Sequence, residues 1–455
     1  MALDPTAGAS VPVASVPDTL RVLGRVLLPT LARGVIVRRP PVVAAAEKLD
    51  TDRFAVQTMQ RLHERYGAGP LLLRTPVRRF ALVLDPDDVS TVLDGSPDPF
   101  AADSAEKRAA LSHFQPGGAL IASGDRRPKA RRLNEQALDH GDPVHHLAAR
   151  FLPKLREEAE ELATFVGATG ELDWDDFVAA WFRAVRRVVF GDGARHDDRL
   201  TDLLHELRAD ANWSALKPKR RRVRARFHRR LAAHLDRAEP GSLAALLREQ
   251  PEAAEIDPVQ QIPQWLFAFD PAGMAAFRAL ALLAAHPDQA QRAREEVTAV
   301  DLDRPQQLPF LRGTVLESLR LWPTTPAILR DTVRDTTWRG GTLPEGSSVV
   351  VYAPYFHRDD RSLSQAHRFD PDLWLAPRDA DAWPLVPFSD GPVVCPGRHL
   401  VLLTTSTFLA TLLDRLEVRL PDGGRLDRDG RLPSVLDPFH LAFEVRRWPA
   451  AAAAG

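Results

Sequence analysis

The sequence predicts a mostly α-helical protein with a minor β part, built around one large domain. Of its 455 residues, 44% are apolar and 27% are charged, which is typical of a globular protein with a substantial core. Residues 129–300 follow a mostly helical pattern, whereas strand signals are short and lie toward the two ends. Since no change in composition marks a second domain, we expect an N-terminal surface segment at 1–50, a single domain at 51–449 and a frayed tail at 450–455.

The charge balance and the cysteine count exclude several classes of protein. The 60 Lys and Arg residues against 61 Asp and Glu residues leave a net charge of −1, which gives no general attraction to nucleic acid. Cys395 is the single cysteine, so a disulfide framework within the chain and a multi-cysteine zinc site are both impossible.

The first elements are short and alternate in type. We expect a helix at 51–66, a hairpin of strands at 71–74 and 80–84, and a helix from Asp87. Turn-forming residues and weak periodicity predict a long loop at 95–125. Such a loop more often carries function than packing.

The later elements are longer and more apolar. Residues 260–286 predict a long apolar helix interrupted by Pro263 and Pro271, and 311–321 predict another that ends at Pro323. Strand signals follow at 349–352, near Leu420 and at 442–445. A last strong helix is expected at 399–413.

Two segments suggest surfaces rather than chemistry. Residues 22–37 are apolar, but Arg25, Pro29 and Arg33 interrupt them, so we expect no membrane span and a cytoplasmic protein. Residues 217–230 carry nine Lys or Arg residues, which we interpret as a solvated helix face rather than an anion-binding face, because Phe227 is the only large aromatic residue among them.

The chemistry concentrates around Cys395. It lies in the segment Phe388-Ser-Asp-Gly391-Pro-Val-Val-Cys395-Pro-Gly397, where both glycines permit tight turns and a helix follows the proline. The sulfur would therefore lie at a helix N-terminus, where the dipole and free N–H groups favour the thiolate. A thiolate held in this way is a suitable axial ligand for haem iron.

This segment resembles the haem-binding loop of the cytochrome P450 superfamily, and three further features occur in that family's order. These are Glu317-Ser-Leu-Arg320, Arg368-Phe369-Asp-Pro371 and His286-Pro287. The resemblance extends from about Thr51 to Val445. It implies the cytochrome P450 fold, a helix-rich triangular prism with small sheets, and haem b ligated by Cys395, with Phe388 shielding the sulfur.

The resemblance also assigns structural and haem-binding roles. Glu317, Arg320 and Arg368 would form a buried network that fixes the backbone leading to the cysteine loop. Arg131 would meet a haem propionate, with Arg127 at the place of the family's usual His or Trp. Val393 stands where the family has an Arg or His, so Arg330 or Arg127 would supply that bond, or it is missing.

The segment that matches the family's oxygen-binding groove departs from the pattern. Asp270 matches the acid that helps to deliver protons, but Pro271 replaces the usual threonine and has no hydroxyl. Proline also cannot donate to the carbonyl of Phe267, so the helix would stay open to water there. Phe267 and Phe269, with Thr325, Ala327 and Ile328, would line a restricted, mostly apolar pocket.

These features predict a haem-thiolate monooxygenase of bacterial type, acting on a small organic or secondary-metabolite substrate. Electrons would come from a separate ferredoxin that docks near Arg126, Arg132 and Arg398, because one cysteine cannot hold an iron–sulfur cluster. We expect a monomer that binds no nucleic acid. Two alternatives remain open: a peroxide-dependent or oxidative-coupling enzyme, for which Pro271 argues, and a haem-binding sensor or carrier without turnover.

Overall fold

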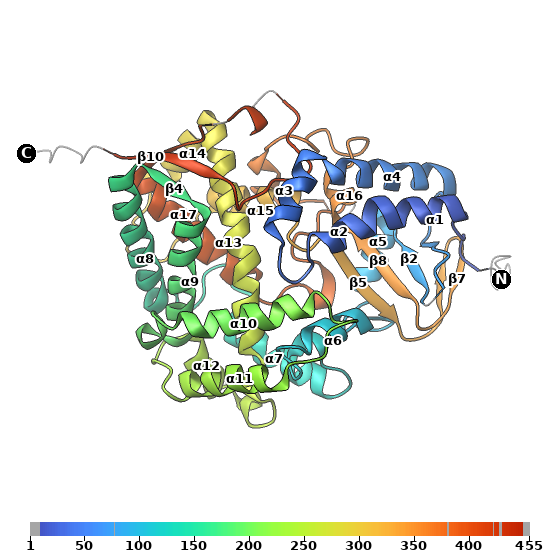
Figure 1. Ribbon diagram of the computed structural model, residues 1–455, viewed down its shortest axis with the longest axis horizontal. Coiled ribbons are helices and arrows are strands. Elements are labelled where there is room, and N and C mark those ends of the chain that lie inside the picture. Colours follow the sequence, from blue (N-terminus) through green and yellow to red (C-terminus); the bar gives the residue numbers. More distant parts are fainter. Residues whose placement is uncertain (1–9, 77, 380–381, 422, 427–429, 449–455) are drawn as a thin grey trace, which may run out of the picture.

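The computed structural model describes residues 10–76, 78–379, 382–421, 423–426 and 430–448, and the tail expected at 450–455 lies outside them. A large helical part and a smaller sheet-containing part lie side by side (Figure 1). The helices of nine residues or more are α3 (Pro40–Lys48), α4 (Thr51–Tyr66), α5 (Pro86–Asp94), α7 (Arg126–Ala137), α8 (Ala148–Thr169), α9 (Trp174–Phe190), α10 (Asp198–Ala211), α11 (Arg221–Asp236), α13 (Ile262–Ala285), α14 (Pro287–Thr298), α15 (Pro309–Leu321) and α17 (Arg398–Arg415).

Shorter helical segments connect these long helices. The short α-helices are α1 (Val16–Val22), α2 (Leu28–Ala32), α6 (Ala105–Leu111), α12 (Leu243–Glu249) and α16 (Ala353–Arg358). A π-helical turn, η1 (Leu23–Leu27), joins α1 to α2, and the 3₁₀ turns that bear on the site are η6 (Pro371–Trp374) and η7 (Gly391–Val393).

The strands form three small sheets. The largest has the order β1 (Leu71–Leu72), β2 (Phe80–Leu82), β8 (Ser348–Tyr352), β5 (Ala327–Thr332) and β3 (Phe100–Ala101). Only the β2–β8 pair in it is parallel. The others are β4 (Glu171–Asp173), β10 (Ala442–Arg447) and β9 (Leu416–Arg419), and the hairpin of β6 (Thr336–Trp338) and β7 (Gly341–Leu343).

Helix α13 crosses the middle of the helical part (Figure 1). It is the one described helix long and apolar enough to cross a membrane, and 78% of its most apolar window is buried in the protein. A helix that is apolar nearly all round is typical of a core position. The core around it also includes α8, α9, α15 and α17.

The expected mostly α fold with a minor β part is confirmed, and the differences are local. Helix α4, the β1–β2 pair and α17 lie where the sequence predicted them. The described part of the N-terminal segment, residues 10–50, does more than cover the surface, because Val22 and Val26 are buried beside the large sheet. The loop expected at 95–125 contains α6 and β3, and α13 continues through Pro271 without interruption.

Candidate functional site

Cys395 lies between the short turn η7 and the start of α17, so its position depends on backbone contacts. Its N–H donates to the carbonyl of Phe388 at 3.0 Å, which folds the loop back on itself. Gly391 has φ +67°, and a Cβ there would lie 2.4 Å from the carbonyl oxygen of Leu93. A glycine is therefore required at 391 by both conformation and space.

The second glycine that the sequence singled out, Gly397, has a different role. Gly397 has φ −97°, which other residues adopt, and the nearest atom to an added Cβ lies 3.6 Å away. The backbone at Gly397 therefore does not use the conformational freedom that the sequence analysis noted for this glycine. The second left-handed position in the loop is Ser389, with φ 64°.

The electrostatics of Cys395 differ from the sequence prediction. Burial raises the pKa of the thiol, while the amide of Gly397 and the charges of Arg131 and Arg398 act in the opposite direction. The helix start alone thus does not hold a thiolate, because desolvation of the charged form outweighs it. A coordinated metal ion deprotonates a thiol outright, so the loop suits a metal-bound sulfur better than a free thiolate.

A row of four cations leads to Cys395: Arg330 is buried, and Lys107, Arg127 and Arg131 are half-buried. Burial, with Arg330 and Arg127 close by, lowers the pKa of Lys107 to about 7. Burial, together with the charge of Arg127, lowers the pKa of Arg330 to about 10. Arg127 in turn lies within the field of Arg131, whose charge also acts on Cys395. Asp103 offsets part of this positive charge at both Lys107 and Arg127, and Asp331 does so at Lys107.

Two of these cations have donors without a partner. Nη1 of Arg127 and Nη2 of Arg131 are buried and make no hydrogen bond to the residues that the structure describes. Arg131 uses its Nε for Glu135, at 2.5 Å. Unpaired buried guanidinium donors are costly, so a bound anionic group would satisfy them. A haem fits this site, because its two carboxylates would accept hydrogen bonds from these guanidinium donors and Cys395 would ligate its iron.

Arg330 connects the row to the cysteine loop. It is 3% exposed, and its Nη2 donates to Oγ of Ser389 at 3.1 Å. Its Nε donates to Oγ of Ser96 at 2.9 Å. The sequence left open whether Arg330 or Arg127 compensates for Val393, and the structure brings both close to the site. Lys107 was missed, because it lies in the segment expected to be a loop.

Glu317 and Arg320 of α15 form a fully buried ion pair, as expected. Nε and Nη2 of Arg320 donate to the two carboxylate oxygens of Glu317 at 2.6 and 2.7 Å. The guanidinium also donates to the backbone carbonyls of His357, Gln365, Ala366 and Arg368. The pair thereby fixes the chain between α16 and η6.

The expected side-chain role of Arg368 was wrong. Its side chain is exposed, and only its carbonyl takes part, as an acceptor from Arg320 at 2.8 Å. The remaining donors to Glu317 are the indole Nε1 of Trp374, at 2.9 Å, and the backbone N–H of Asp370, at 3.0 Å. A neutral indole therefore stands where a second arginine was predicted, which leaves the buried network with one cation and one anion.

Helix α13 carries an unusual contact at the residue before Asp270. Pro271 has no N–H for the carbonyl of Phe267, but the helix continues. Trp181 of α9 is fully buried, and its indole N–H donates to the carbonyl of Phe269 at 2.8 Å. A Cβ on Gly273 would lie 2.9 Å from the Trp181 ring, so this glycine makes room for the indole.

Asp270 is held by an arginine that the sequence analysis missed. Nη2 of Arg208, from α10, lies 2.5 Å from its carboxylate, and both side chains are mostly buried. The guanidinium also lies 4.6 Å from the centroid of the Phe267 ring. The pair ties α10 to α13, and no local spacing in the sequence could reveal it because the residues are 62 positions apart.

The predicted pocket residues separate into different environments. Phe267 is half-buried and packs edge-on against Phe114, with ring centroids 5.8 Å apart. Phe269 is 3% exposed and packs against Trp181 in the helical core. Ile328 is buried in the core of the large sheet, Ala327 is half-buried beside it on β5, and Thr325 is exposed.

An amide network, also missed, positions the loop before α7. The side-chain oxygen of Gln261 accepts from the N–H of Ala119 at 3.0 Å and from Nδ2 of Asn134 at 3.1 Å. The indole N–H of Trp265 donates to Asn134 at 2.7 Å. Since Asn134 lies one turn from Arg131, these bonds fix the cation row relative to α13.

Comparisons with known proteins agree with this geometry. A family model described as "Cytochrome P450" matches residues 268–439. A cyclooctat-9-en-7-ol 5-monooxygenase of Streptomyces melanosporofaciens is 31% identical over 173 residues, covering 36% of this chain and 38% of that protein. Probable cytochrome P450 4s3 of Drosophila melanogaster is 30% identical over 164 residues, covering 36% and 33%. The matched part therefore spans about a third of these relatives' length.

Solved structures match over a much larger share. A zebrafish cytochrome P450 with abiraterone has a TM-score of 0.69 at 21% identity, covering 87% of this chain and 100% of that one. A retinoic acid-bound cyanobacterial CYP120A1 has a TM-score of 0.70 at 17% identity, covering 86% and 94%. The fold is thus the cytochrome P450 fold, and residues 268–439 are similar to the cytochrome P450 family.

Proposed function

We propose that the chain is a haem-thiolate monooxygenase that oxidises a small organic substrate with O₂ and electrons from a separate ferredoxin-type protein. The observation that supports this most is the row of cations ending at Cys395, where buried donor atoms of Arg127 and Arg131 have no hydrogen-bond partner among the described residues. The names of the relatives, one of them a monooxygenase, point to the same class of reaction.

Several residues would hold haem b, each at a different part of the group. Cys395 would ligate the iron, and Arg127 and Arg131 would bind the propionates with Lys107 and Arg330 close by. When bound, the haem supplies the oxidising chemistry, and electron density from the thiolate favours O–O cleavage.

Asp270 would hold a proton close to the substrate side of α13. Its ion pair with Arg208 fixes the orientation of the carboxylate. For Asp270 to pass on a proton, this pair has to loosen, which ties proton transfer to movement of α10. The free carbonyl of Phe267, left by Pro271, is an acceptor for a water molecule beside it.

The basic surface near the cysteine loop would receive the electron donor. Arg126 and Arg132 of α7 are exposed, and Arg398 at the start of α17 is half-buried. An acidic ferredoxin would be attracted to this face, at a rate that falls as ionic strength rises. We also propose that the protein acts as a cytoplasmic monomer and that its substrate is a secondary metabolite.

A second candidate function is peroxide-dependent oxidation or oxidative coupling. Pro271 supports this candidate, because its side chain has no hydroxyl and the neighbouring Asp270 is ion-paired with Arg208. Such an enzyme would not need protons delivered for O₂ activation.

The test is turnover of the haem-loaded protein with two oxidant supplies in parallel. After a candidate substrate is found by its Soret shift, product is measured with NADH, reductase and ferredoxin, and separately with hydrogen peroxide. The monooxygenase proposal expects product mainly in the first arm, and product only with peroxide would support the alternative. Pro271→Thr should lower peroxide release per NADH in the first arm, and unchanged coupling would contradict the role given to Pro271.

A further inference from the structure

Two imidazoles and a carboxylate meet in the segment between α7 and α8, residues 138–147, which we call the α7–α8 loop. The nitrogen and oxygen atoms that Asp139, His145 and His146 offer as ligands all lie within 4.8 Å of one another. Oδ2 of Asp139 lies 3.5 Å from Nδ1 of His145 and 2.6 Å from Nδ1 of His146. None of these side chains takes part in the haem site.

His145 is already oriented as a metal ligand. It is 3% exposed, and its Nε2 donates to the carbonyl of Ala137 at 3.2 Å. Because Nε2 carries the proton, Nδ1 keeps its lone pair, which accepts from the N–H of Leu147 at 3.0 Å. A backbone carbonyl at the far nitrogen is the arrangement that orients most metal-bound histidines. A metal ion would replace the Leu147 amide at Nδ1, and this amide, one residue before α8, would turn to water.

Asp139 and His146 supply the other two ligand atoms. Oδ2 of Asp139 accepts from the backbone N–H of His146 and from its Nδ1, both at 2.6 Å. The carboxylate is 15% exposed, whereas the His146 side chain is 54% exposed. The His146 ring is therefore free to turn, and its proton can move to Nε2, where water accepts it.

The distances and the ligand types fit zinc. Zinc bonds of about 2.0–2.1 Å to nitrogen and oxygen place two ligands of a tetrahedral site about 3.3 Å apart. The 3.5 Å between Asp139 and His145 matches this spacing, and the 2.6 Å hydrogen bond to His146 would widen by about 0.7 Å. Imidazole suits Zn²⁺, whereas Mg²⁺ and Ca²⁺ prefer oxygen ligands alone. Such a site needs no cysteine.

The α7–α8 loop lies against the segment that carries Cys395. A Cβ on Gly397 would lie 3.6 Å from Cδ1 of Leu138. Nδ1 of His140 lies 3.3 Å from the carbonyl oxygen of Pro396. Both contacts come from the immediate neighbours of Asp139, so an ion bound there acts directly on the part of the loop that touches the cysteine segment.

We propose that Asp139, His145 and His146 bind a divalent transition-metal ion of the Zn²⁺ class, with water in the remaining coordination position. The ion would join the start of the α7–α8 loop to its end and hold the loop against the cysteine segment. It would be a structural ion with no part in the oxidation. Its binding does not depend on the proposed oxidation reaction, so the failure of either leaves the other intact.

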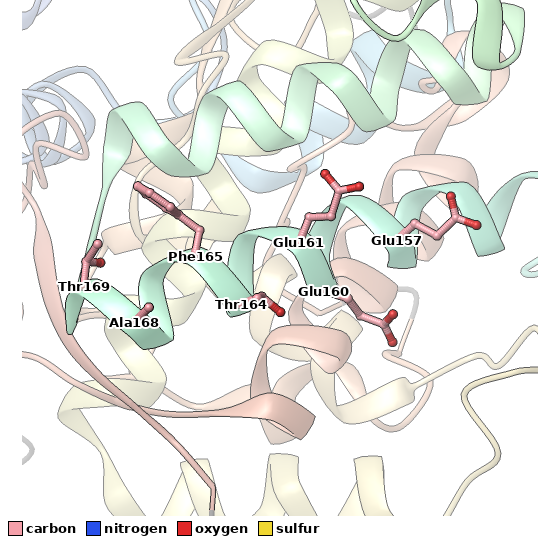
Figure 2. A pocket seen from close by; sticks show the side chains of 7 residues that line it. All are labelled: Glu157, Glu160, Glu161, Thr164, Phe165, Ala168 and Thr169. Atoms are coloured by element: carbon pink, nitrogen blue, oxygen red, sulfur yellow. The ribbon is translucent and has the colours of Figure 1, made fainter.

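Two other groups of side chains provide matched controls. Glu157, Glu160 and Glu161 of α8 line a shallow groove and offer carboxylates alone (Figure 2). His205 of α10 is an exposed histidine next to Glu206. Glu160→Gln with Glu161→Gln, and separately His205→Gln, therefore remove side chains of the same types without touching the proposed site.

The experiment is equilibrium dialysis of the full-length haem-loaded protein against micromolar free Zn²⁺ or millimolar Mg²⁺, with the bound metal measured by mass spectrometry. The test variants are Asp139→Asn and His146→Gln. We expect about one zinc ion per chain in the wild type and in both controls, and at least about tenfold weaker binding in each test variant. Zinc should also slow amide hydrogen exchange in residues 138–147 of the wild type, but not of Asp139→Asn.

Several results would overturn the proposal. The site is refuted if the wild type binds no zinc, if both test variants bind it as the wild type does, or if the controls weaken binding equally. Equal binding of Mg²⁺ would refute the ligand assignment, and zinc binding without slower exchange would refute the structural role. Circular dichroism and haem content identify a variant that failed to fold. Since His146 is exposed, His146→Gln carries the test if Asp139→Asn does not fold.

Discussion

Replacement of Glu317 by alanine should remove most of the stability of the cysteine-loop region. Four hydrogen bonds reach its carboxylate: two from Arg320, one from the N–H of Asp370 and one from the indole of Trp374. In Glu317→Ala these donors lose their acceptor in a place that water does not reach, since Glu317 and Arg320 are both 0% exposed.

The magnitude follows from the burial of Arg320. Breaking a buried pair by removing one partner costs about 3–5 kcal/mol, because an uncompensated charge remains. Arg320 keeps four backbone carbonyl acceptors, which lessens the cost. The orphaned indole and amide N–H groups add about 1 kcal/mol each. We therefore expect a loss of about 4 kcal/mol, a large part of the stability of a typical domain.

The assay is urea unfolding of the wild type and the variant, followed by circular dichroism, together with the ratio of Soret to protein absorbance. Glu160→Ala is the matched control, because Glu160 pairs with Arg415 at 3.0 Å with both side chains about half exposed. Such a surface pair contributes about 0–1 kcal/mol. If Glu317→Ala unfolds within 1 kcal/mol of the wild type and keeps its haem, the structural role of the pair is refuted.

Three further predictions concern haem retention, helix α13 and acid stability. Arg131→Ala should release haem at least about tenfold faster to apomyoglobin than the wild type, because a buried propionate partner is lost; an unchanged rate would contradict its role. Trp181→Phe keeps the ring but removes the bond to Phe269, so amide hydrogen exchange in α13 should rise at constant overall fold, and unchanged exchange would count against it. Burial lowers the pKa of His357 to about 3 and of His367 to about 4. Between pH 6.5 and 4 these two histidines bind protons in the unfolded chain but not in the folded chain. Acidification therefore favours unfolding, and the free energy of unfolding should fall by up to about 1.4 kcal/mol per proton for each pH unit. A flat profile in urea titrations over that range would contradict this.

The sequence predicted the parts of the site that depend on local spacing. Glu317 and Arg320 are three residues apart on one helix, so their contact follows from helix geometry. The turn at Gly391 before Cys395 could also be predicted, because few residues other than glycine adopt a left-handed backbone conformation.

The partners that come from distant elements could not be predicted. Arg208 reaches Asp270 only because α10 lies across α13, and Trp374 replaces the expected arginine because η6 turns its indole toward Glu317. Lys107 was hidden because α6 is a short helix in a segment rich in turn formers, where periodicity is a weak signal.

The different surroundings of the predicted pocket residues could not be read from the sequence for a related reason. Phe267 and Phe269 are two residues apart, so on a helix their side chains point in different directions. Phe267 meets Phe114 and Arg208, whereas Phe269 meets Trp181. Only the packing of α9 and α10 against α13 decides which of the two lies on the substrate side.

The most direct test of the central claim is the ferrous–CO spectrum of the haem-loaded protein beside that of Cys395→Ala. If Cys395 ligates the iron, the wild type should show the red-shifted Soret band of a thiolate-ligated haem. In the variant this band should be absent, even when haem is added in excess. A wild-type spectrum without the thiolate band, or the same thiolate band in both proteins, would contradict the assignment of Cys395 as the ligand.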